Sequence, residues 1–112
     1  MNKKQVLWHI EALEEYSEWQ NEDLKKANKI TKLIKEILRE GVLKGTGKPE
    51  RLKYSGGYSR RIDQEHRLVY EVENDILVII SCKGHYEDWK MKGENLISGK
   101  RKNTKKFRKA FK

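Results

Sequence analysis

The sequence predicts an α+β domain in which two helices pack on one face of a small antiparallel sheet. Apolar residues recur at helical spacing over the first 40 residues, whereas runs rich in Val, Ile and Tyr occur between residues 58 and 81. A stretch with three glycines and the only proline, residues 41–49, separates the two halves and predicts an irregular connection. Helices that precede strands, instead of alternating with them, favour this class over a parallel α/β fold.

The N-terminal half begins with a short apolar run at residues 5–8, which predicts a first strand. Three residues then fall at i, i+4 and i+7 and predict a first helix: Ala12, Tyr16 and Trp19. The apolar stripe of a second helix consists of Ala27, Ile30, Ile34 and Ile37. Asn21 is the expected N-cap of this second helix, which runs to about Arg39. Because so few residues separate the two patterns, we expect an antiparallel helical hairpin.

The C-terminal half carries three predicted strands, at residues 58–62, 67–72 and 76–81. Residues 73–75, Glu-Asn-Asp, are typical of a hairpin loop between the last two. Tyr70 alternates with Val69 and Glu71, and we expect it in the core.

Length and charge divide the chain into a domain at residues 1–86 and a basic extension at residues 87–112. The chain has 112 residues and a net charge of +9, and the extension alone has ten Lys and Arg against three acidic residues. This excess favours a polyanionic partner. The one cysteine, Cys82, excludes an internal disulfide, and no apolar run is long enough for a membrane span. We therefore expect a reduced, cytoplasmic protein with no membrane contact.

Seven residues form the candidate site: Glu50, Lys53, Arg60, Arg61, Arg67, His85 and Tyr86. A carboxylate, a histidine and several arginines suit cleavage of RNA, in which the substrate's own 2′-hydroxyl attacks the adjacent phosphate. A base accepts the 2′-proton, an acid protonates the leaving 5′-oxygen, and cations stabilise the charge at phosphorus. Such a reaction needs no metal and no other cofactor. Tyr58 and Tyr86 are candidates for stacking on RNA bases. The alternative is that these residues are solvated charges on the open face of a sheet.

The sequence resembles the Txe/YoeB family of toxins from toxin–antitoxin modules. The motifs that carry the resemblance are KPE at 48–50, GYSRRI at 57–62, EHRLVY at 65–70 and HY at 85–86. The resemblance implies a RelE-like fold and a ribosome-associated mRNA endonuclease, an mRNA interferase that arrests translation. It also implies an acidic antitoxin of the YefM/Phd type and a homodimer.

The same resemblance assigns roles to individual residues. Glu50 matches the family's general base, Arg67 the stabiliser of the phosphorus intermediate, and His85 the general acid. Tyr86 matches a tyrosine that orients the substrate base. The remaining positions, expected to bind RNA, are Lys53, Arg60 and Arg61 from the family and Tyr58 from its place beside the basic strands.

The basic extension departs from the family, whose members usually end at or just after the His-Tyr pair. We interpret residues 87–112 as an auxiliary RNA-binding arm. Two further hypotheses stay open from sequence: that the extension folds over the site and weakens cleavage, or that it has no role. The alternative to a nuclease is a non-catalytic relative that binds RNA or an antitoxin.

Overall fold

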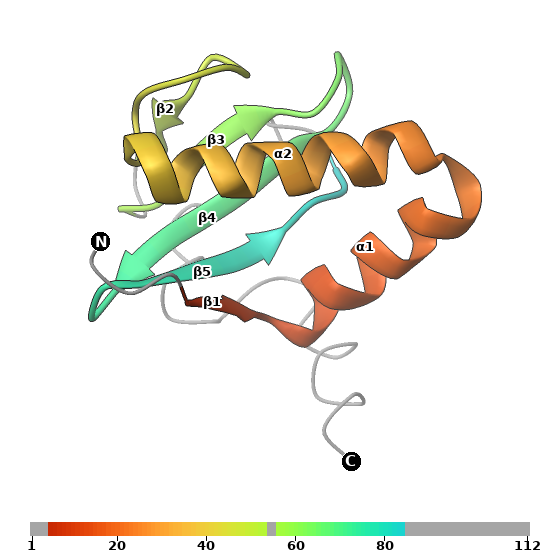
Figure 1. Cartoon of the computed structure of the whole chain (residues 1–112), viewed down its shortest axis with the longest axis horizontal. Helices are drawn as coiled ribbons and strands as arrows, with labels where there is room; N and C mark the ends of the chain where they lie inside the picture. Colours follow the sequence, from red (N-terminus) through yellow and green to blue (C-terminus); the bar gives the residue numbers. More distant parts are fainter. Residues whose placement is uncertain (1–4, 54–55, 85–112) are drawn as a thin grey trace.

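A five-stranded sheet and two helices make up the described part of the chain, residues 5–53 and 56–84, in the computed structural model (Figure 1). The elements in chain order are β1 (Val6–Trp8), α1 (Ile10–Glu22), α2 (Leu24–Glu40), β2 (Glu50–Arg51), β3 (Tyr58–Arg61), β4 (Arg67–Glu73) and β5 (Ile76–Ser81). The predicted α+β class is confirmed. The predicted extension, with His85 and Tyr86 before it, lies outside the described residues.

The strands lie in the order β1-β5-β4-β3-β2, so the first strand in the chain lies at one edge beside the last. Strands β2 to β5 pair antiparallel, but β1 runs parallel to β5, with Val6 opposite Leu77. The sheet is therefore mixed, and the prediction of a wholly antiparallel sheet is wrong at this edge. Strand β2 is an addition that the sequence pattern did not predict, because two residues are too few to show a period.

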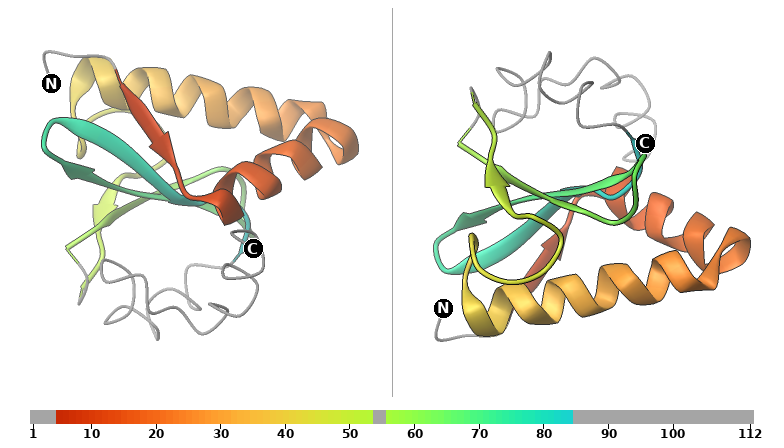
Figure 2. Two further views of the ribbon diagram at one scale, coloured as in Figure 1. Left: turned by 90° about the horizontal axis from the view of Figure 1, so that it is seen from below. Right: turned by 90° about the horizontal axis from the view of Figure 1, so that it is seen from above.

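The helices α1 and α2 form the predicted hairpin and cover one side of the sheet (Figure 2). They meet at Asp23, whose extended backbone (φ −156°, ψ 90°) interrupts the helical path and whose carbonyl accepts hydrogen bonds from the N–H groups of Lys26 and Ala27. Asp23 is therefore the N-cap, and the prediction of Asn21 for that position is wrong because α1 continues through residue 21.

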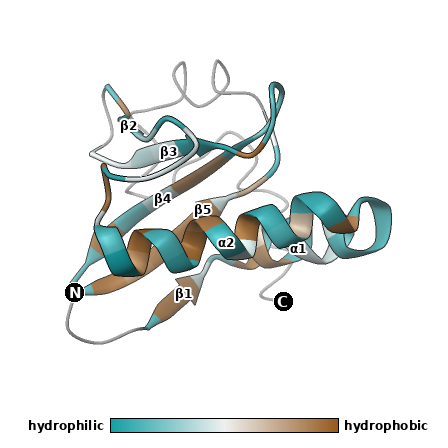
Figure 3. Cartoon of the chain, turned by 45° about the horizontal axis from the view of Figure 1, so that its top comes forward, coloured by the Kyte–Doolittle hydropathy of each residue, from teal (hydrophilic) through white to brown (hydrophobic). Residues whose placement is uncertain are grey.

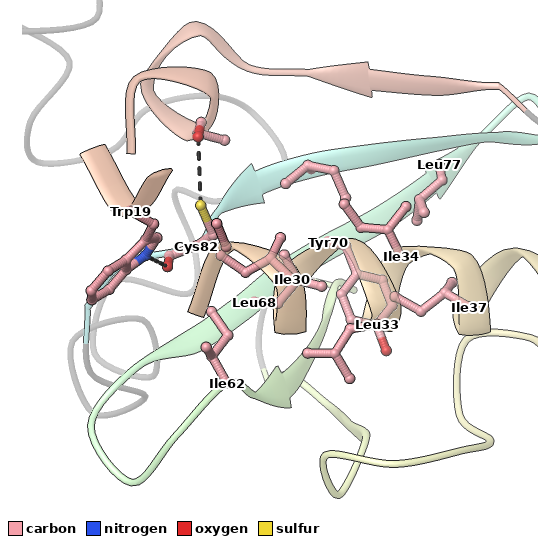
Figure 4. Packing of buried hydrophobic residues seen from close by; sticks show 13 residues of the cluster. Trp19, Ile30, Leu33, Ile34, Ile37, Ile62, Leu68, Tyr70, Leu77 and Cys82 are labelled. Atoms are coloured by element: carbon pink, nitrogen blue, oxygen red, sulfur yellow. Dashed lines mark hydrogen bonds between the residues drawn. The ribbon is translucent and has the colours of Figure 1, made fainter. Parts of the chain in front are cut away.

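The main core lies between the helices and the sheet (Figure 4). Its fully enclosed members include Ile30, Leu33 and Ile37 from α2 and Tyr70 from β4, which confirms the core position predicted for this tyrosine. In Figure 3 the α2 ribbon alternates between hydrophobic and hydrophilic turns, as expected of a helix with one buried side. Each such buried side chain contributes about 1.5–3 kcal/mol relative to an exposed position.

The opposite face of the sheet has a smaller apolar cluster: Leu52, Val69, Val78 and Ile80. It arises from strand alternation, because Leu68 and Tyr70 point toward the helices and the residues between and beside them point away. On this second face the apolar residues come from β4, β5 and the position after β2, and the charged residues Glu50 and Arg61 come from the edge formed by β2 and β3. We call this side the helix-free face.

Candidate active site

A carboxylate and a guanidinium meet on the helix-free face. Nη1 of Arg67 lies 3.2 Å from Oε1 of Glu50 and 3.3 Å from Oγ of Ser59. The three residues are neighbours because Glu50 is opposite Ser59 in the β2–β3 register, and Arg67 begins β4 two positions from the partner of Ser59. The Glu50 side chain remains 46% exposed and that of Arg67 12% exposed, so solvent or a ligand reaches the carboxylate. The structure thus brings two of the predicted site residues together.

Arg61 lies beside this pair. It is exposed and is directly opposite Arg67 in the β3–β4 register, so both side chains belong to the same face. Like charges placed directly opposite one another destabilise a sheet, and an anion between them would remove that repulsion. The position of Arg61 therefore agrees with a contact to phosphate.

Arg60 has the opposite orientation, and its predicted role in RNA binding is wrong. Its side chain is fully buried on the helix side. Nε donates to the hydroxyl of Tyr70 at 2.9 Å, and Nη1 donates to Oε1 of Glu36 at 3.1 Å. The other guanidinium donors reach the backbone carbonyls of Gly41, Lys44 and Thr46 at 2.6 to 3.1 Å. A guanidinium enclosed in this way has no surface to offer to a phosphate.

The contacts of Arg60 instead fix the connection at residues 41–49, which leads into Glu50. Thr46 adds two hydrogen bonds to Oε1 of Glu36, from its N–H at 2.7 Å and from its hydroxyl at 2.8 Å. These hydrogen bonds from Thr46, together with the charge of Arg60, lower the pKa of Glu36. An irregular loop thus receives a fixed path, which ends at the carboxylate of the candidate site.

Tyr58 also lies on the helix side, away from the Glu50–Arg67 pair. Its ring stacks on Tyr70 with the centroids 5.7 Å apart, and the guanidinium of Arg51 lies 5.3 Å from its centroid. The structure gives Tyr58 a packing role, and this placement does not support base stacking beside Glu50 and Arg67.

The end of β5 is anchored by contacts that the sequence pattern did not reveal. Oε1 of Glu15 accepts hydrogen bonds from the Cys82 N–H at 2.8 Å and from the Ser81 hydroxyl at 3.0 Å. Nε1 of Trp19 donates to the Cys82 carbonyl at 2.8 Å (Figure 4). Nζ of Lys83 lies 4.7 Å from the Trp19 ring centroid. Burial raises the pKa of the Cys82 thiol, so the thiol stays protonated. Cys82 is therefore an unreactive core cysteine.

The turn before β4 is fixed as well. Oδ1 of Asp63 accepts the N–H groups of Glu65 at 2.7 Å and His66 at 2.6 Å, and Oδ2 lies 3.1 Å from Nζ of Lys26. Burial disfavours the ionised carboxylate, but the hydrogen bonds from His66, Lys26 and Glu65 outweigh it and lower the pKa of Asp63. This turn sets where Arg67 begins its strand.

Of the other predicted site residues, Lys53 is exposed just beyond β2. The site residue that sequence reasoning missed is Ser59, which is buried and accepts a hydrogen bond from Arg67. Its only sequence signal is strand alternation with Arg61. Within residues 5–53 and 56–84, no three His, Cys, Asp or Glu side chains gather in an arrangement able to hold a metal ion. In the same ranges, neither helix is long and apolar enough to cross a membrane.

Two helices over one face of a mixed sheet, and a carboxylate–arginine pair on the other, define a small α+β protein equipped for chemistry on an anionic substrate. A family model described as the YoeB-like toxin of bacterial type II toxin–antitoxin systems matches residues 8–86. The chain belongs to this family, as its resemblance to Txe/YoeB toxins predicted. YoeB toxins are ribosome-dependent endoribonucleases, and the chain is an enzyme of that class.

Individual relatives agree. Toxin YoeB of Escherichia coli K12 is 46% identical over 83 residues, which cover 72% of this chain and 98% of that toxin. A YoeB–YefM toxin–antitoxin complex from Staphylococcus aureus, described as heterotetrameric, contains a chain that is 48% identical to this one. The two chains superpose with a TM-score of 0.69, and the match covers 73% of this chain and 97% of that one. A YoeB dimer from the same organism gives the same identity, TM-score and coverage.

Proposed function

We propose that this toxin cleaves mRNA on the ribosome and so arrests translation, with Glu50 as general base and Arg67 as the group that stabilises the phosphorus intermediate. The observation that carries the proposal is the Glu50–Arg67 pair, 3.2 Å apart on the helix-free face, with Arg61 opposite Arg67. A base must lie within reach of the proton it accepts, and a cation must lie where negative charge develops. In this proposal Glu50 and Arg67 serve these two purposes at the same phosphate.

In this mechanism the 2′-hydroxyl of the nucleotide before the scissile bond supplies the nucleophile. Its proton passes to the Glu50 carboxylate as the 2′-oxygen attacks phosphorus. The guanidinium of Arg67, held by Glu50 and Ser59, stabilises the added charge on the phosphate oxygens. The bond from phosphorus to the 5′-oxygen then breaks, and that oxygen receives a proton. The products are a 2′,3′-cyclic phosphate and a 5′-hydroxyl end, and no step needs a metal or other cofactor.

We assign the final proton transfer to His85 and the orientation of the base to Tyr86, both outside the described residues. Support comes from the chain that leads to them. Gly84 directly precedes His85, and its carbonyl accepts a hydrogen bond from the Arg67 N–H at 3.2 Å. Arg67, which starts β4, thus holds the residue directly before His85.

Other contacts to RNA belong to the rim of this face. We propose that Arg61 and Lys53 hold phosphates near the scissile bond, and that the basic extension at 87–112, beyond the domain at 1–86, adds phosphate contacts. The contribution of the extension would fall steeply as salt concentration rises.

We propose an acidic antitoxin of the YefM type as the neutralising partner, together with a homodimer of the toxin. The support is the YoeB–YefM complex and the YoeB dimer from Staphylococcus aureus. A target on the ribosome places the protein in the cytoplasm.

The test is a cell-free translation reaction on a defined mRNA, with 5′ ends mapped by primer extension, with and without ribosomes. We expect cleavage within the reading frame that requires ribosomes and falls about 100-fold or more in Glu50→Gln. Glu73→Gln is the matched control, since Glu73 is an exposed glutamate at the far end of β4. Equal cleavage by Glu50→Gln and the control would remove Glu50 from the mechanism. RNA binding without cleavage by any protein would favour the non-catalytic alternative.

A further inference from the structure

Gly84 is held on both sides by two consecutive residues, His66 at the end of the β3–β4 turn and Arg67 at the start of β4. Its N–H donates to Nδ1 of His66 at 2.9 Å, and its carbonyl accepts the Arg67 N–H at 3.2 Å. Its backbone has φ +128°, which glycine adopts readily and other residues do not. These restraints fix the position of residue 84, and hence the point from which the chain continues into His85.

The hydrogen bond from Gly84 determines which nitrogen of the His66 ring carries the proton. Nδ1 accepts a hydrogen bond from the Gly84 N–H, so it carries no proton of its own, and the proton of the neutral ring is on Nε2. The ring itself is held edge-on against Trp19, with centroids 4.9 Å apart, and the His66 N–H is bound by Oδ1 of Asp63. His66 is therefore oriented from two directions before it binds Gly84.

We propose that His66 is a positioning residue for the cleavage reaction: it fixes Gly84, the residue directly before His85. This inference rests on the proposed role of His85 as general acid. Misplacement of a catalytic group by about 1 Å can cost on the order of 100-fold in rate, so an anchor one residue away has a large effect.

The anchor is local, which separates it from a general folding role. Ser81 and Cys82 are tied to α1 through Glu15 and Trp19, and Lys83 is paired with Glu18. His66 makes none of these hydrogen bonds and ion pairs, although its ring packs against Trp19, and we expect them to keep β5 in place when the ring is replaced. Loss of the His66 contact therefore releases Gly84, the residue directly before His85.

The test compares His66→Asn with His66→Gln. The amide of Asn reaches the place of Nδ1 and can accept the Gly84 N–H, whereas the amide of Gln extends toward the place of Nε2. Both variants lose the ring contact to Trp19, and they differ in which of the two ring nitrogens the side-chain amide replaces. Urea unfolding of both variants checks that the fold is retained.

The readout is single-turnover cleavage on ribosomes carrying a short mRNA with either oxygen or sulfur as the 5′ leaving atom. Sulfur leaves without the help of an acid, so a defect in acid catalysis disappears on the sulfur substrate. We expect His66→Gln to cleave the oxygen substrate about 10- to 100-fold more slowly than wild type and the sulfur substrate at nearly the wild-type rate. His66→Asn should recover most of the oxygen rate.

Two reference variants separate the possible failures. His85→Ala should regain activity on the sulfur substrate, and Arg67→Ala should stay slow on both. If His85→Ala is not rescued by sulfur, the acid role of His85 fails, and with it the proposed mechanism. If His85→Ala is rescued but His66→Gln is slow on both substrates, or equals His66→Asn, the positioning role of His66 is overturned.

Discussion

The two faces of the sheet use arginine in opposite ways. Arg60 and Arg67 lie on adjacent strands, yet Arg60 is fully buried against Tyr70 and Glu36, whereas Arg67 meets the exposed Glu50. The helix side surrounds its guanidinium with acceptors, which leaves no capacity for a ligand. The helix-free face leaves a carboxylate open to solvent beside its guanidinium. The first arginine builds the scaffold, and we propose that the second serves the reaction.

The sharpest test of the scaffold role is Arg60→Met. Removal of the guanidinium deprives Glu36 of its ion pair and three loop carbonyls of their donors, so we expect a loss of about 3–5 kcal/mol in the free energy of unfolding. Urea denaturation measures it. Arg61→Met, on the next residue of the same strand, is the control and should change stability by no more than about 0.5 kcal/mol. Equal losses of stability in Arg60→Met and Arg61→Met would contradict the scaffold role of Arg60.

Glu36, the acidic partner of Arg60, should make the stability of the fold depend on pH. The lowered pKa of Glu36 means that the folded chain binds fewer protons than the unfolded chain in the acid range. Glu36 therefore stabilises the fold above its ordinary pKa of 4.5, and this contribution is lost as pH falls through the folded value. Urea unfolding between about pH 7 and about pH 3 should show a shallower acid decline in Glu36→Gln than in wild type. A decline as steep as that of the exposed control Glu40→Gln would contradict this account.

The smallest predicted effect concerns Glu71, on the helix-free face of β4. Burial raises the pKa of Glu71, and its Oε2 has no hydrogen-bond partner in the described part of the chain. A raised folded pKa gives a contribution that is present at low pH and lost as pH rises through that value. Glu71→Gln should therefore stabilise the chain at neutral pH, by up to about 1 kcal/mol. No gain over the exposed control Glu40→Gln in thermal unfolding would show that the Glu71 charge is accommodated.

The elements that the sequence predicted well are those with long, regular patterns. The stripe on α2 and the β-rich runs of β4 and β5 are repeated often enough to identify both element type and buried side. The family motifs assigned Glu50 and Arg67 to one site, and the strands that carry them, β2 and β4, lie on either side of β3.

What the sequence could not settle depends on contacts between distant residues. Alternation puts Arg60 and Arg61 on opposite faces, but only the approach of Glu36, 24 residues away in sequence, shows which of the two is buried. The bond from Gly84 to His66 spans 18 residues and leaves no trace in any local pattern. The parallel position of β1 likewise depends on the path of the whole chain.

The most direct test of the central claim measures activity and stability together in Arg67→Ala, with Arg51→Ala as the control on β2. The two readouts are single-turnover cleavage on mRNA-programmed ribosomes and urea unfolding. We predict that Arg67→Ala cleaves about 100- to 1,000-fold more slowly than wild type while its free energy of unfolding falls by no more than about 1 kcal/mol. Cleavage at the rate of Arg51→Ala, or a rate loss explained by unfolded protein, would contradict a catalytic role for the helix-free face.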